Sequence, residues 1–77
     1  MKEPSPVLVT GATGYIGSRL IPRLAGQGYR VRAFGRSMEK MAQRHWACLP
    51  EVELFQGDVL NKEDLVRASK GCAAAYY

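Results

Sequence analysis

The sequence predicts an α/β fold, a doubly wound parallel sheet, and three observations lead to this expectation. Short apolar runs alternate with stretches in which apolar residues recur every three or four positions. The first apolar run leads straight into a glycine-rich turn, and the turn leads into a helical pattern. Three strand–helix units and the start of a fourth strand follow in series. Because crossovers between parallel strands are right-handed, these strand–helix units predict a sheet with the spatial order 3-2-1-4.

The first strand is expected at Val7–Thr10, which is apolar on both faces, as is typical of a central parallel strand. The proline-bearing segment Met1 to Pro6 is expected to lie outside the sheet. From Tyr15 to about Gln27 the apolar residues share one helical face. Pro22 lies inside this helix and lacks an N–H group, but the apolar period continues through it in phase, so a bend is expected there rather than an end.

The second strand is expected at Val31 to Phe34, and Ser37 can cap a short helix that runs to about Gln43. The segment His45 to Pro50 is less regular. A third strand is expected at Val52 to Phe55, with Gly57 ending it.

Asn61 is expected to cap a third helix, whose early acids Glu63 and Asp64 suit the positive end of the helix dipole, and Gly71 to stop it. Cys72 to Tyr77 is expected to begin a fourth, buried strand, with Cys72 as a small core residue.

The turn after the first strand has the glycine spacing GxxGxxG, with Gly11, Gly14 and Gly17 in TGATGYIG. Gly11 permits a tight turn, Gly14 permits backbone to approach a pyrophosphate, and Gly17 permits close packing of the helix. Unpaired amides and the helix dipole then favour a two-phosphate anion. The alternative is a glycine-rich turn without a ligand. A P-loop that binds a nucleoside triphosphate is excluded, because no Lys followed by Ser or Thr comes after the glycines.

The segment TGATGYIG resembles the extended and atypical short-chain dehydrogenase/reductases, and the likeness continues through SRLIPRLAGQGYRVRAFGR and GDVLNKEDL. The resemblance implies that residues 1–77 are the N-terminal part of an NAD(P)-binding Rossmann domain, with the substrate and catalytic part absent from this chain. The residues expected to bind the cofactor are Gly11, Ala12, Thr13, Gly14, Tyr15, Ile16, Gly17, Arg36, Ser37, Asp58 and Val59.

The end of the second strand indicates which cofactor is preferred. An NAD-binding unit usually has Asp or Glu there, whereas this chain has Gly35 and Arg36. A guanidinium can grip a 2′-phosphate through charge-assisted hydrogen bonds, and Ser37 can add a hydroxyl and helix-start amides. NADP is therefore favoured over NAD. The alternative is that Arg36 is an ordinary solvated arginine, and Arg32 is a weaker second candidate.

Asp58 and Val59 follow the third strand. The resemblance implies that the acidic residue binds the adenine amino group and that the backbone of the next residue contacts the ring. The alternative is a turn in which Asp58 bonds its own backbone, which is common for Asp after Gly.

No catalytic residue is expected in this chain. Reductases of the resembled family carry a YxxxK pair, but Tyr15 is followed four residues later by Arg19 and Tyr29 by Ala33. Tyr15 is instead expected to pack beside the pyrophosphate. The single histidine, His45, has no partner at a catalytic spacing, and the two cysteines have no metal-ligand spacing, so no metal is expected.

Two functions remain open. The first is the cofactor-binding portion of an NADP-dependent oxidoreductase or epimerase/dehydratase-like enzyme, acting on a small-molecule substrate that the sequence does not identify. The second is a noncatalytic NADP-binding redox-sensing regulator or scaffold subunit. A YxxxK pair in the rest of a longer chain would favour the enzyme.

Charge and hydropathy limit which other classes of partner the chain can have. The net charge of +4 is scattered along the chain rather than clustered, which argues against nucleic acid. No apolar stretch approaches the ~20 residues that cross a bilayer, and no secretory segment is evident, so a cytoplasmic protein with reduced thiols is expected. A four-stranded sheet of this length would have an open edge and an uncovered face, so the remainder of the polypeptide or a partner chain is expected to cover it.

Overall fold

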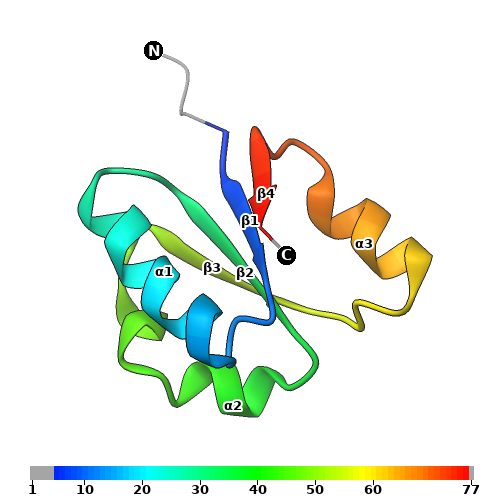
Figure 1. Cartoon of the computed structure of the whole chain (residues 1–77), viewed down its shortest axis with the longest axis horizontal. Coiled ribbons are helices and arrows are strands. Elements are labelled where there is room, and N and C mark those ends of the chain that lie inside the picture. The colour runs from blue at the N-terminus through cyan, green and yellow to red at the C-terminus, as the bar shows by residue number, and fades with distance from the viewer. Residues whose placement is uncertain (1–4, 77) are drawn as a thin grey trace.

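A computed structural model describes residues 5–76 as a four-stranded parallel sheet with helices on both faces (Figure 1). The spatial order is β3-β2-β1-β4, which confirms the predicted order 3-2-1-4. The elements in chain order are β1 (Val7–Thr10), α1 (Tyr15–Gly26), β2 (Val31–Gly35), α2 (Met38–Ala42), the 3₁₀ turn η1 (His45–Cys48), β3 (Val52–Gln56), α3 (Lys62–Ser69) and β4 (Ala74–Tyr76).

Strand β1 lies at the centre of the chain's core, and all four of its residues are buried. Val7 is paired with Val31 of β2 on one side and with Ala74 of β4 on the other. Burial on both faces confirms the prediction from its uninterrupted apolar run. The carboxyl ends of β1, β2 and β3 therefore meet at one edge of the sheet, where the turns that follow them converge.

Each face of the sheet has its own apolar cluster. On the face covered by α1, α2 and η1, side chains of β1 and β2 pack with Ile21, Met41 and Trp46. On the opposite face, Leu8 and Phe34 pack with Ala68 of α3. Trp46 is completely buried, and its indole N–H has no hydrogen-bond partner among residues 5–76. The segment expected to be irregular thus supplies the largest buried side chain of the described structure.

The helix boundaries follow local signals in the sequence. Helix α1 continues through Pro22, as expected from the unbroken apolar period, and the bend there stays a prediction. Ser37 caps α2 by accepting the Lys40 N–H (3.2 Å), and Asn61 caps α3 by accepting two backbone N–H groups. Gly71, two residues after α3, has φ +77°, a conformation that disfavours side chains and suits its predicted role as a stop.

The expectation of a buried fourth strand is wrong for the residues that can be described. The strand begins at Ala74 instead of Cys72, and all three of its residues are exposed, with Tyr76 48% exposed. Cys72 is half-buried, and it packs at the edge of the cluster that contains Leu8, Phe34 and Ala68. The physical reason is that β4 is an edge strand, paired with β1 on one side only. Helix α3 packs against Leu8 of β1 and Phe34 of β2. Tyr77 and most of the predicted lead-in, residues 1–4, lie outside the described residues.

Candidate functional site

The turn between β1 and α1 is closed by its own backbone. Gly11 has φ +63°, in the left-handed region that favours glycine. The Gly14 N–H donates to the Gly11 carbonyl (2.9 Å), and the Ala12 N–H donates to the Phe34 carbonyl of β2 (3.1 Å). The chain therefore reverses direction within four residues and is tied to the neighbouring strand.

Gly17 lets α1 begin directly against this turn. A Cβ atom at Gly17 would lie 2.4 Å from the Gly11 carbonyl oxygen and 3.1 Å from the Ala12 Cα, and both are backbone atoms. Ser18 completes the contact by donating its hydroxyl to the Ala12 carbonyl (2.9 Å). This close approach is the packing expected of the third glycine.

The first turn of α1 leaves its amides available. The first amide bonded within the helix region is that of Ser18, which donates to the Gly14 carbonyl. Gly14 provides no side-chain cap, and the first turn of the helix contains no acidic residue. The side chains of Tyr15 and Ile16 are 77% and 76% exposed. Unpaired N–H groups at the positive end of a helix are a favourable place for an anion.

Two pockets flank the turn, and Gly11 contributes to both. The first pocket lies between β1, β4 and α1, and its lining includes Thr10, Tyr15, Leu20 and Tyr76. The second pocket lies over the ends of β2 and β3. It is lined by glycine-rich backbone and by five side chains, those of Thr13, Arg36, Ser37, Lys40 and Val59. No carboxylate is present in that lining. In open α/β sheets, ligands bind at this edge.

The side chains expected to select the cofactor lie together in the second pocket. Arg36 is exposed and also borders a neighbouring hollow that Asp58 lines. The Ser37 oxygen accepts the Lys40 N–H, which leaves the hydroxyl hydrogen free to donate. Lys40 was missed by the sequence reasoning. Its position three residues after a capping serine could have identified it, because that spacing returns the side chain to the same side of the helix.

Asp58 forms the turn that the sequence allows as its alternative role. Its Oδ1 accepts the Leu60 N–H (2.9 Å), and its own N–H donates to Asp64 Oδ2 (2.9 Å). Asp64 in turn accepts from Arg67. Val59 is 43% exposed in the second pocket. The loop after β3 is therefore shaped by Asp58, and a contact of Asp58 or Val59 with adenine stays a prediction.

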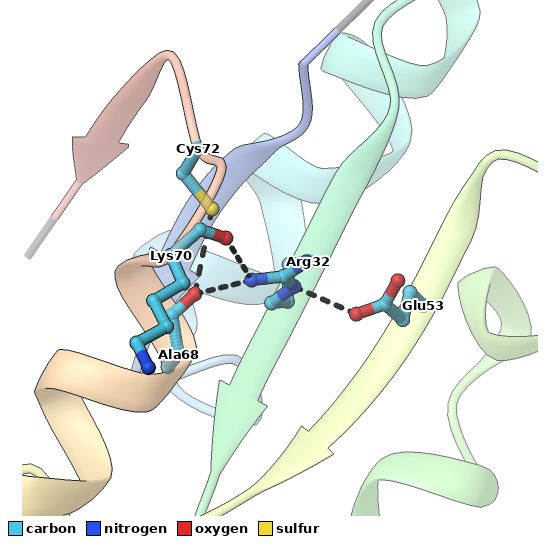
Figure 2. Close-up of polar contacts among 5 residues, drawn as sticks. All are labelled: Arg32, Glu53, Ala68, Lys70 and Cys72. Carbon is cyan, nitrogen blue, oxygen red and sulfur yellow. Dashed lines mark hydrogen bonds and ion pairs between the residues drawn. The ribbon is translucent and has the colours of Figure 1, made fainter. Parts of the chain in front are cut away.

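Arg32, the weaker candidate for a phosphate ligand, has a structural role instead (Figure 2). Its Nε donates to Glu53 Oε1 on β3 (2.6 Å), and its Nη1 donates to the carbonyls of Ala68 (2.6 Å) and Lys70 (2.9 Å). Side chains alternate along β2, so Arg32 shares the α3 face with Phe34. This arginine holds the end of α3 to the sheet, and Glu53 of β3 is its ion-pair partner.

Tyr15 is bound by an arginine rather than placed for proton transfer. Arg19 Nη1 donates to the Tyr15 hydroxyl (2.5 Å), and the Arg19 guanidinium lies 4.9 Å from the ring centroid. His45 is exposed, next to the buried Trp46. Within residues 5–76, no group of three or more metal-ligating side chains comes together. Over the same residues, none of the helices has the length and apolar character needed to cross a membrane.

The parallel order 3-2-1-4, with a glycine turn feeding a helix at the end of the central strand, defines a dinucleotide-binding Rossmann unit. Residues 11–77 match the model of the NAD(P)H-binding family, and the chain belongs to that family. Together with the similar proteins described next, this match confirms the resemblance to the extended short-chain dehydrogenase/reductases.

Similar proteins of known identity include both enzymes and a regulator. A dihydroflavonol 4-reductase of Callistephus chinensis is 39% identical over 84 residues, covering 100% of this chain and 23% of the relative. The crystal structure of vestitone reductase from alfalfa superposes with a TM-score of 0.75 at 29% identity, covering 92% of this chain and 24% of that one. The NADP complex of NmrA, a negative transcriptional regulator, superposes with a TM-score of 0.80 at 29% identity, covering 96% and 23%. The chain thus spans about a quarter of the length of these relatives.

Proposed function

We propose that this chain is the N-terminal, cofactor-binding portion of a reductase and that it binds NADP in preference to NAD. The observation that carries the proposal is the second pocket, where Arg36, Ser37 and Lys40 lie beside the glycine turn with no carboxylate in the lining. The family match supports nicotinamide dinucleotide as the ligand class.

The pyrophosphate would bind at the start of α1. Gly11 and Gly17 bring backbone and helix together there, and the amides after Gly14 carry no side-chain cap. These features act on the part of the ligand that NADP and NAD share, so they supply affinity without selecting between the two.

The 2′-phosphate of NADP would bind in the second pocket. Arg36 offers a planar fork of donors that suits phosphate, and Lys40 adds a second positive charge in the same lining. The Ser37 hydroxyl can donate a further hydrogen bond. A ribose-binding carboxylate, which would favour NAD, is absent at the end of β2, where Gly35 is followed by Arg36.

A reductase is the better supported activity for the whole protein, because reductases are prominent among the relatives at 35% identity or more. The hydride chemistry would belong to the cofactor and to residues outside this chain, since no YxxxK pair occurs in it. A noncatalytic redox-sensing regulator is the second candidate, favoured by the superposition on NmrA. Oxidation of NADPH by the full-length protein with small carbonyl substrates would favour the reductase, and binding without turnover would favour the regulator.

Arg36→Ala is expected to weaken NADPH binding by about 1.5–3 kcal/mol, the range for hydrogen bonds to a charged group. That loss corresponds to about 10- to 150-fold in Kd, and NADH affinity is expected to stay the same. Isothermal titration calorimetry of the full-length protein with both cofactors measures the two values. An equal loss for both would remove Arg36 as the selecting residue.

Arg32→Ala is a matched control, because it removes the same type of side chain four residues earlier, within β2, where it binds the end of α3 and does not line the second pocket. We expect it to lower the thermal midpoint, since the carbonyls of Ala68 and Lys70 lose their donor. The ratio of NADPH to NADH affinity is expected to stay at the wild-type value. A wild-type protein that bound neither nucleotide would refute the proposed function itself.

A further inference from the structure

We propose that Arg44 is a positioning residue that holds the dinucleotide-binding turn in its binding conformation. Its Nη2 donates to the Thr13 carbonyl (3.0 Å), across 31 positions of sequence. The inference rests on the proposed function, because it concerns the same turn. It assigns the turn a support that no local sequence pattern indicated.

The hydrogen bond ties one wall of the second pocket, at Thr13, to the segment that follows α2. Thr13 belongs to the turn between β1 and α1, and it lines that pocket together with Ser37 and Lys40 from the start of α2. Arg44 follows α2 in the chain. The guanidinium therefore links the turn to the segment that carries the phosphate-selecting side chains.

The backbone of Arg44 is itself held in place. Its N–H donates to the Met41 carbonyl (3.1 Å), and its own carbonyl accepts the Ala47 N–H (3.0 Å). Met41 and Trp46, on either side of it in sequence, are both completely buried. An exposed side chain that starts from an anchored backbone loses less conformational freedom when it makes a contact than one on a mobile loop.

The contact determines the orientation of the peptide group between Thr13 and Gly14. The carbonyl of this group accepts from Arg44, and its N–H donates to the Gly11 carbonyl (2.9 Å). With both ends bonded, the peptide is kept from rotating its carbonyl toward a bound phosphate, where two negative oxygens would repel each other. The guanidinium also places a positive charge beside the turn.

Both effects act on the pyrophosphate, which NADP and NAD share. Arg44 should therefore raise the affinity for both cofactors by the same factor. This behaviour distinguishes it from Arg36, whose effect is expected on NADP alone.

Arg44→Ala in the full-length protein is expected to raise the Kd of NADPH and that of NADH by about 5- to 10-fold each, the loss of one net hydrogen bond. Arg44→Lys is expected to restore most of the affinity, because an ammonium can donate to the same carbonyl. Arg23→Ala is the control, since it removes one exposed positive charge from α1 away from the turn. It should change neither Kd.

Calorimetric titration with the two nucleotides, and thermal unfolding without them, test the assignment. A loss confined to NADPH would place Arg44 on the 2′-phosphate and overturn the proposal. Unchanged affinities, or a lysine variant as weak as the alanine variant, would overturn it as well. These results are distinct from failure of the proposed function, in which the wild-type protein itself binds neither nucleotide.

Discussion

Gly17→Ala is expected to reduce the affinity for NADPH and NADH by about 10- to 150-fold, because moving the helix start costs at least one hydrogen bond to the charged pyrophosphate, about 1.5–3 kcal/mol. The new Cβ would lie 2.4 Å from the Gly11 carbonyl oxygen and 3.1 Å from the Ala12 Cα. Neither backbone atom can rotate away, so α1 must shift from the turn and take its amides with it. Overpacking of this kind also destabilises the fold by about 1–3 kcal/mol.

Gly26→Ala provides the matched control for this substitution. Gly26 lies in the same helix, and a Cβ there would meet nothing within 4 Å. Alanine at Gly26 is expected to leave both affinities unchanged and to be neutral or slightly stabilising. Titration and thermal unfolding of the two variants separate the effect of contact from the effect of helix propensity. Wild-type affinity in Gly17→Ala would contradict the close-packing argument.

Trp46→Ala is expected to have the largest effect on stability, about 3–5 kcal/mol of the free energy of unfolding. Trp46 is completely buried and packs with Met41 and Ile21 beneath α1. Small domains are stable by only about 5–15 kcal/mol, so this loss would remove a large share of the total. Urea unfolding followed by far-ultraviolet circular dichroism measures it, since this signal comes mainly from the backbone and remains when the indole is removed.

Trp46→Phe adds a test of the unpaired indole N–H. Phenylalanine keeps most of the buried ring and removes a buried donor that has no partner among the described residues. Trp46→Phe is therefore expected to lower the free energy of unfolding much less than Trp46→Ala does. The control is His45→Ala, at the exposed neighbouring position. Its free energy of unfolding should lie within about 0.5 kcal/mol of the wild-type value. A phenylalanine variant as unstable as the alanine variant would contradict this account of the packing.

Much of the fold could be predicted from short-range patterns. The apolar run Val7–Thr10 identified a central strand, and Ser37 and Asn61 identified two helix starts within a residue of where the structure has them. The glycine spacing in 11–17 predicted the shape of the turn, because left-handed φ at Gly11 and the close contact at Gly17 exclude side chains.

The contacts of side chains that act across the sheet were harder to predict from the sequence. Arg32 looked like a second phosphate ligand because it lies four residues before Arg36, but it lies within β2 on the α3 face, where Glu53 and the end of α3 bind its guanidinium. For Lys40 the spacing from the capping Ser37 was the only signal, and for Arg44 neither residue type nor spacing distinguishes it from other surface cations.

The chain's own sequence determined the order of strands and helices, the turn that receives α1 and the caps that begin α2 and α3. These features depend on the φ preferences, side-chain caps and apolar period of residues close together in the chain. Tertiary structure alone decided that Arg32 binds the end of α3, that Arg44 holds Thr13 and that β4 is exposed at the edge. Those contacts join residues far apart in sequence, and which side chains face one another is settled only when the strands pair and the helices pack.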